Sequence, residues 1–142
     1  MILLDTTILS YAVGDEHPLR APCRRVLAAH GSGHIDATTT VEVVQEFTHV
    51  RARRRGRPDA VTLARQYAAA FALLVTQPED LELGLTLFAR HVELGAFDAI
   101  VAAVALNRHA TALVSADAAF GVVPNLAWID PSADALDRLI GD

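Results

Sequence analysis

Lysine is absent from the 142 residues, and cysteine occurs only once, at Cys23. The missing lysine excludes a P-loop nucleotide site and a phosphate-accepting receiver domain, because both depend on a lysine side chain. A single cysteine excludes an internal disulfide and a cysteine-built zinc site, and it is consistent with a reducing cytoplasm. No apolar run is long enough to cross a bilayer, and the first residues have no basic leader, so we expect neither a transmembrane segment nor a signal peptide.

The composition that remains is typical of a globular protein. Hydrophobic residues make up 52% of the chain and charged residues 20%, which argues against a disordered or low-complexity segment. At this length we expect a single domain over residues 1–142. The net charge is −5, yet six arginines and one acid between Arg51 and Arg65 give that segment a local charge of +5. The rest of the chain is strongly acidic, so nucleic acid could approach only one chosen face.

Short apolar runs alternate with longer amphipathic stretches along the whole chain, which predicts an α/β fold with a parallel sheet and helices on both faces. The five predicted strands are Ile2–Leu4, Ile35–Thr39, Leu73–Val75, Ala112–Ser115 and Ala127–Ile129. Predicted helices fill the intervals, and one of them is capped by Thr39 or Thr40 and ends before Gly56. In such folds ligands bind outside the carboxyl ends of the strands, so that edge is where we expect chemistry.

Acidic residues gather at this predicted edge. Asp5 follows the first strand, Asp117 follows the fourth, and Asp98 lies in the first turn of a nearly all-apolar helix. Glu42 and Glu46 lie four residues apart, on one face of the helix after the second strand. Each acid alone could be a helix cap, a turn residue or a solvated position. Together, with no lysine to neutralise them, they would repel one another unless a cation such as Mg²⁺ or Mn²⁺ held them.

Four short segments, in this order, resemble the motifs of the PIN-domain nucleases. They are Met1-Ile-Leu-Leu-Asp5-Thr6-Thr7, Val43-Val44-Gln45-Glu46-Phe47, Phe97-Asp98-Ala99 and Leu113-Val114-Ser115-Ala116-Asp117. The compact size is similar to that of VapC-type toxins of bacterial toxin–antitoxin pairs. Thr7 stands where many members have Asn or Ser, and it keeps a hydroxyl but no amide. No further acid precedes Phe120, as one does in many members.

The resemblance implies a five-stranded parallel sheet, Mg²⁺- or Mn²⁺-dependent cleavage of RNA, a homodimer, and inhibition by a small VapB-type antitoxin. It also implies that Asp5, Glu46, Asp98 and Asp117 bind metal, with Thr6 and Ser115 as supporting hydroxyls. Some members place the glutamate closer to the second strand, which would select Glu42 instead. The Val-Val-Gln-Glu-Phe string favours Glu46, and Glu42 would then be a supporting group near the site.

The arginine-rich segment continues the helix of Glu46, with Arg51, Arg53 and Arg54 one to two turns beyond it. These arginines could be a solvated helix end, a contact for a second copy or an antitoxin, or a track for RNA phosphates. The sequence therefore predicts a cytoplasmic metal-dependent endoribonuclease. The alternative is a catalytically inactive PIN-like domain that binds only RNA or a protein.

Overall fold

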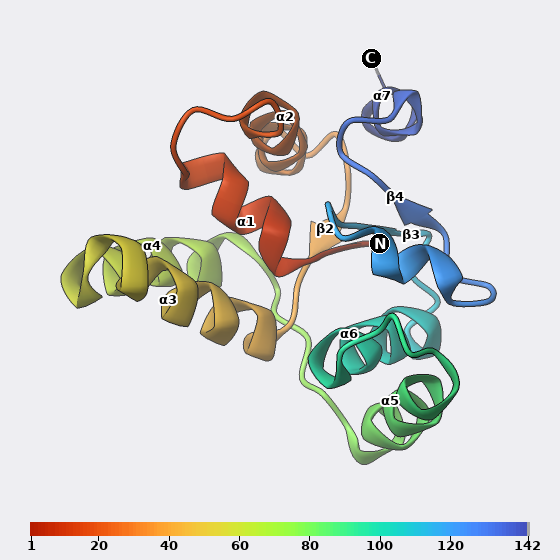
Figure 1. Ribbon diagram of the computed structural model, residues 1–142. Helices are drawn as coiled ribbons and strands as arrows, with labels where there is room; N and C mark the ends of the chain where they lie inside the picture. Colours follow the sequence, from red (N-terminus) through yellow and green to blue (C-terminus); the bar gives the residue numbers. More distant parts are fainter. Residues whose placement is uncertain (142) are drawn as a thin grey trace.

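A four-stranded parallel sheet forms the centre of the computed structural model, which describes residues 1–141 (Figure 1). Its strands are β1 (Ile2–Leu4), β2 (Ala37–Thr38), β3 (Ala112–Val114) and β4 (Trp128–Ile129), in the order β2-β1-β3-β4. In the register, Leu3 lies opposite Thr38 on one side and Leu113 on the other. The first strand of the chain is therefore an inner strand. Its three apolar residues are buried on both faces, as is usual in parallel sheets.

The fifth strand predicted at Leu73–Val75 was wrong as a strand. Leu74 forms only an isolated bridge with Thr40, through hydrogen bonds from its own N–H to Thr39 and from the Val41 N–H to its carbonyl. The physical reason is that the chain turns into a helix at Val41, so the neighbouring edge offers no further partner. Val75 is accordingly 59% exposed.

Seven α-helices and one 3-10 helix among the described residues surround the sheet, and they confirm the predicted alternation. They are α1 (Thr6–Val13), α2 (Arg20–Gly31), α3 (Val41–Arg55), α4 (Arg57–Ala70), α5 (Pro78–Arg90), α6 (Ala96–Asn107), η1 (Ala118–Val122) and α7 (Asp134–Ile140). In Figure 1, α1, α2 and α7 lie on one side of the sheet, α5 and α6 lie on the other, and the α3–α4 pair extends outward. The Thr40 hydroxyl caps α3 by accepting the Val43 N–H, and Gly56, at φ +87°, separates α3 from α4. None of the described helices is long and apolar enough to span a membrane.

The helix that carries Asp98, α6, is held against α5 at close range. Asp80 of α5 is fully buried and accepts hydrogen bonds from Asn107 and Arg108, at the end of α6. Midway along the pair, Gly84 of α5 meets the backbone of Ile100. A Cβ added at Gly84 would lie 2.7 Å from Ile100 Cγ1 and 3.0 Å from its Cα. The missing side chain therefore sets the distance between the two helices.

We expect Gly84→Ala to lower the free energy of unfolding by about 1–3 kcal/mol, because the new methyl group would force α5 and α6 apart. Gly31→Ala is the matched control, since it also replaces a helical glycine but meets nothing within 4 Å. The control should be neutral or stabilising by up to about 1 kcal/mol. Urea denaturation followed by circular dichroism measures both, and equal effects in the two variants would contradict the tight packing at Gly84.

Candidate active site

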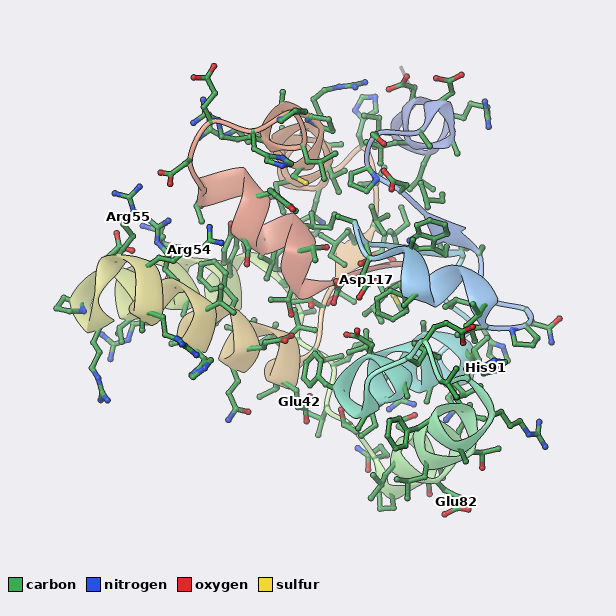
Figure 2. All side chains as sticks on the ribbon, viewed as in Figure 1. Glu42, Arg54, Arg55, Glu82, His91 and Asp117 are labelled. Atoms are coloured by element: carbon green, nitrogen blue, oxygen red, sulfur yellow. The ribbon has the colours of Figure 1, made fainter. Side chains whose placement is uncertain are left out.

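A cavity of about 460 Å³ opens at the carboxyl ends of β1 and β3, where the sequence predicted the site. Four carboxylates from four separate segments line it: Asp5 after β1, Glu46 on α3, Asp98 on α6 and Asp117 before η1. Figure 2 shows Asp117 near the centre of the molecule, beside the start of α1. The parallel sheet brings these distant residues together, because neighbouring strands end at the same edge.

Asp5 is the most buried of the four acids, with 3% of its surface exposed. Its Oδ2 accepts hydrogen bonds from the Ser115 hydroxyl at 2.7 Å and from the Thr7 hydroxyl at 3.1 Å. Its Oδ1 is also buried, but it has no hydrogen-bond partner in the part of the chain that the structure describes. Burial raises the pKa of Asp5, although the hydrogen bonds from Ser115 and Thr7 act in the opposite direction.

Thr7 does more than the sequence analysis assigned to it. Its hydroxyl donates to Asp5, accepts the Ala116 N–H at 3.0 Å, and lies 3.3 Å from the Ser115 hydroxyl. The Ser115 hydroxyl in turn accepts the Asp117 N–H at 3.0 Å. Thr7 and Ser115 thus connect the start of α1 to the segment after β3 and fix the backbone beside Asp117. The signal for Thr7 was its position two residues after the first acid.

The two candidate glutamates on α3 face different parts of the molecule. Glu46 lines the acidic cavity, and its Oε2 accepts the Thr6 hydroxyl at 2.5 Å. Glu42 lines a separate hollow of about 180 Å³, together with apolar residues of α6. Figure 2 shows Glu42 at the beginning of α3, on the side next to α6. The structure therefore places Glu46 with the other three acids and leaves Glu42 outside the cavity.

Asp98 lies within the electrostatic influence of the other three acids of the cluster. Burial and the neighbouring charges of Asp5, Asp117 and Glu46 raise its pKa to about 7, and a hydrogen bond with Asp117 adds to the effect. Asp117 also accepts the Ala119 N–H at 2.9 Å, which caps η1. Four acids around one cavity therefore repel one another when all are ionised, and a cation would relieve this repulsion.

The residues fit a hard, oxygen-bound cation better than any other group. Carboxylates and hydroxyls line the cavity, and the buried Asp5 Oδ1 has an unused lone pair. Within residues 1–141, no three His, Cys, Asp or Glu side chains are arranged to hold a metal ion by themselves. Mg²⁺ tolerates this, because it commonly binds through one or two carboxylates and keeps several waters or substrate oxygens.

The arginines of α3 divide between two tasks. Arg51 pairs with Asp59 at 2.5 Å and donates to the Val13 carbonyl at 2.9 Å, and Arg55 pairs with Asp15. Of the arginines in the described chain, Arg54 alone lines the cavity. Arg53 is exposed and is not among the residues that line the cavity. The α3 residues that line the cavity, Glu46, Val50 and Arg54, are spaced four apart along the helix.

Comparison with known proteins gives one consistent result. A family model for the PIN domain matches residues 2–126. Ribonuclease VapC7 of Mycobacterium tuberculosis is 48% identical over 153 aligned residues, which cover 100% of this chain and 99% of that protein. Among solved structures, the sarcin–ricin loop cleaving toxin VapC20 of M. tuberculosis aligns with a TM-score of 0.72 and 18% identity, over 85% of this chain and 93% of that chain. A toxin–antitoxin complex from Klebsiella pneumoniae gives a TM-score of 0.69 and 16% identity, over 92% and 98%. The chain therefore belongs to the PIN-domain family, among the VapC ribonucleases.

Proposed function

We propose that this protein is a metal-dependent endoribonuclease that hydrolyses RNA phosphodiester bonds and acts as the toxin of a VapBC-type pair. The observation that carries the proposal is the meeting of Asp5, Glu46, Asp98 and Asp117 around one cavity. The ribonuclease that is 48% identical over the full chain supports the substrate class. The fold shared with a toxin–antitoxin complex supports a VapB-type antitoxin as partner. The cytoplasm is the compartment where such a toxin would meet its RNA.

The metal in this proposal is Mg²⁺ or Mn²⁺, held by Asp5, Glu46, Asp98 and Asp117. When bound, it supplies a Lewis acid that stabilises the charge developing on the phosphate and makes water a stronger nucleophile. Ser115 and Thr7 orient the Asp5 carboxylate, and Thr6 orients Glu46. These hydroxyls hold the acids in place before RNA arrives, so little rearrangement is needed on binding.

Arg54 is the residue that we propose to hold an RNA phosphate beside the cavity. It lines the cavity wall, and no ion pair involves it among the described residues. Arg53 would contribute only long-range attraction from its exposed position, and the charge of Arg51 is largely neutralised by Asp59.

We further propose that residues 1–142 work as one nuclease domain and that two copies form a homodimer. Three exposed apolar side chains along one face of α5 support the dimer: Leu81, Leu85 and Phe88.

The proposed role of Asp98 predicts a particular pH dependence of stability. Its pKa is about 7 in the folded protein and about 4 in an unfolded chain. Between these values only the folded state holds the proton, so stability should fall as the pH rises from about 4 to 7. In metal-free protein, the melting temperature of Asp98→Asn should therefore decrease less over this pH range than that of the wild type. Asp134→Asn, which changes an exposed carboxylate, should behave as wild type. Identical pH profiles for all three proteins would contradict the repulsion. Added Mg²⁺ or Mn²⁺ should stabilise the wild type more than Asp98→Asn.

Two separate glutamate-to-glutamine substitutions on α3 test the proposed enzymatic activity. Glu46→Gln should lower the rate of RNA cleavage by more than about 100-fold. Mutation of a residue that only hydrogen-bonds to a metal ligand already lowers metal affinity or activity by about 10–100-fold, and Glu46 is proposed to bind the metal itself. Glu42→Gln should cost less than about 10-fold, since Glu42 lies outside the acidic cavity. Cleavage of end-labelled RNA with Mg²⁺ or Mn²⁺ measures both rates. Wild-type activity in Glu46→Gln would refute the proposed site. Loss of activity only in Glu42→Gln would assign the metal-binding role to Glu42, one helical turn earlier.

A neighbouring pair of arginines separates direct phosphate contact from general charge. Arg54→Glu should weaken RNA binding and reduce the slope of log affinity against log salt by about 1 or more. Arg53→Glu makes the same change in net charge one residue away, at a side chain that does not line the cavity. It should have a clearly smaller effect. Fluorescence anisotropy at several salt concentrations gives both slopes, and equal slopes for the two variants would remove the specific role of Arg54.

A further inference from the structure

Two aromatic rings stack on the wall of the acidic cavity. Tyr11, in the last turns of α1, and His17, in the loop between α1 and α2, have ring centroids 4.5 Å apart and planes inclined by 29°. Both residues line the cavity that also contains the four acids and Arg54. Tyr11 is half-buried, whereas His17 is exposed, so the outer face of the pair is accessible to a ligand. The mechanism proposed above gives these rings no task.

The ring pair is held in place by its own loop. The Leu19 N–H donates to His17 Nδ1 at 3.1 Å, so in the neutral ring the proton lies on Nε2. The Arg20 N–H donates to the His17 carbonyl at 3.0 Å, and the Gly14 N–H donates to the Tyr11 carbonyl at 3.2 Å. The first contact orients the His17 ring, and the two backbone contacts hold the main chain that carries both rings.

A second set of contacts anchors the same loop to α3. The Arg51 guanidinium donates to the Val13 carbonyl at 2.9 Å, and Arg55 pairs with Asp15. Two arginines four residues apart therefore fasten the loop from one face of α3. Because the loop is already ordered, a ligand that contacts it loses less conformational entropy on binding.

The charges around the rings indicate which part of a nucleotide they would meet. Glu16 lines the cavity next to the rings, and its negative charge disfavours a phosphate there, whereas the charge of Asp15 is balanced by Arg55. Arg54, also on the cavity wall, favours one. Stacked rings with an exposed outer face suit the flat face of a nucleobase.

We propose that Tyr11 and His17 form a stacking platform for one nucleobase of the substrate, next to the phosphodiester that faces the four acids. The inference rests on the proposed ribonuclease function and adds to it a position on the cavity wall where a base of the substrate binds. A base inside a duplex has both faces covered by its neighbours, so the platform selects an unpaired nucleotide, in single-stranded RNA or a loop. Stacking tolerates every base, so the platform sets the position of the RNA strand more than its sequence.

The test compares two small probes that differ only in the base. Adenosine 5′-monophosphate and ribose 5-phosphate carry the same sugar and phosphate. Neither contains a phosphodiester bond, so the protein cannot cleave them during the titration. Titration of the full chain in the presence of Mg²⁺, followed by NMR, gives both dissociation constants. We expect the nucleotide to bind about 5- to 100-fold more tightly than ribose 5-phosphate. We also expect ring-current shifts at the resonances of Tyr11 and His17.

Three variants assign the preference to the platform. His17→Ala should reduce the nucleotide preference to nearly one and leave ribose 5-phosphate binding unchanged, whereas His17→Phe, which keeps a ring, should retain it. His49→Ala removes an exposed histidine of α3 that lies away from the cavity lining, and it should behave as wild type. Because His17 is exposed, its variants should keep the wild-type amide spectrum away from the loop.

The proposal is overturned if the wild type binds the two probes equally, or if His17→Ala keeps the full preference. These outcomes are separate from the fate of the ribonuclease proposal. If the protein prefers the nucleotide through His17 but cleaves no RNA, the stacking platform is supported and the ribonuclease proposal is refuted. If cleavage depends on Glu46 but the protein shows no preference for the nucleotide, the ribonuclease proposal is supported and the platform is refuted.

Discussion

The hydrogen bonds that Asp5 accepts from Ser115 and Thr7 are the contacts on which the site depends. They join the end of β1 to the end of β3, and through the same two hydroxyls they fix the N–H groups of Ala116 and Asp117. One oxygen of Asp5 is thus fully engaged, while the other is buried without a partner. Burial raises the pKa of this carboxyl group and so disfavours its charged form, a common conflict between stability and activity at functional sites.

The strand-end rule made the acidic cluster predictable from the sequence. Asp5 and Asp117 each follow a short apolar run, and parallel strands must end at one edge, so their meeting required no knowledge of side-chain packing. The choice between Glu42 and Glu46 could not be made in this way. Both lie on nearly the same face of α3, and only the position of α6 decides that Glu42 belongs to a different hollow.

Other features depended on contacts that no local pattern encodes. The run at Leu73–Val75 has the composition of a strand, but the early start of α3 leaves it a single bridge. The arginines of α3 formed one charged segment in the sequence, whereas in the structure their roles depend on which partner each meets. Arg51 finds a partner at the end of α1 and Arg55 finds one in the loop after it, whereas Arg54 lines the cavity. The stacked Tyr11 and His17 were missed because the five residues between them run from the end of α1 into an irregular loop, and no periodic pattern relates the two rings.

The central place of β1 also determines when the protein becomes complete during synthesis. The first strand to leave the ribosome pairs with β3, whose residues 112–114 are made more than a hundred residues later. Asp5 therefore cannot accept its hydrogen bond from Ser115 until late in synthesis, and the acidic cavity cannot form until Asp117 has also emerged. A nascent chain has no assembled cavity through most of its translation, and a product truncated before residue 112 lacks the partner strand altogether. Chain order thus delays the appearance of the finished site until almost the whole polypeptide has been made.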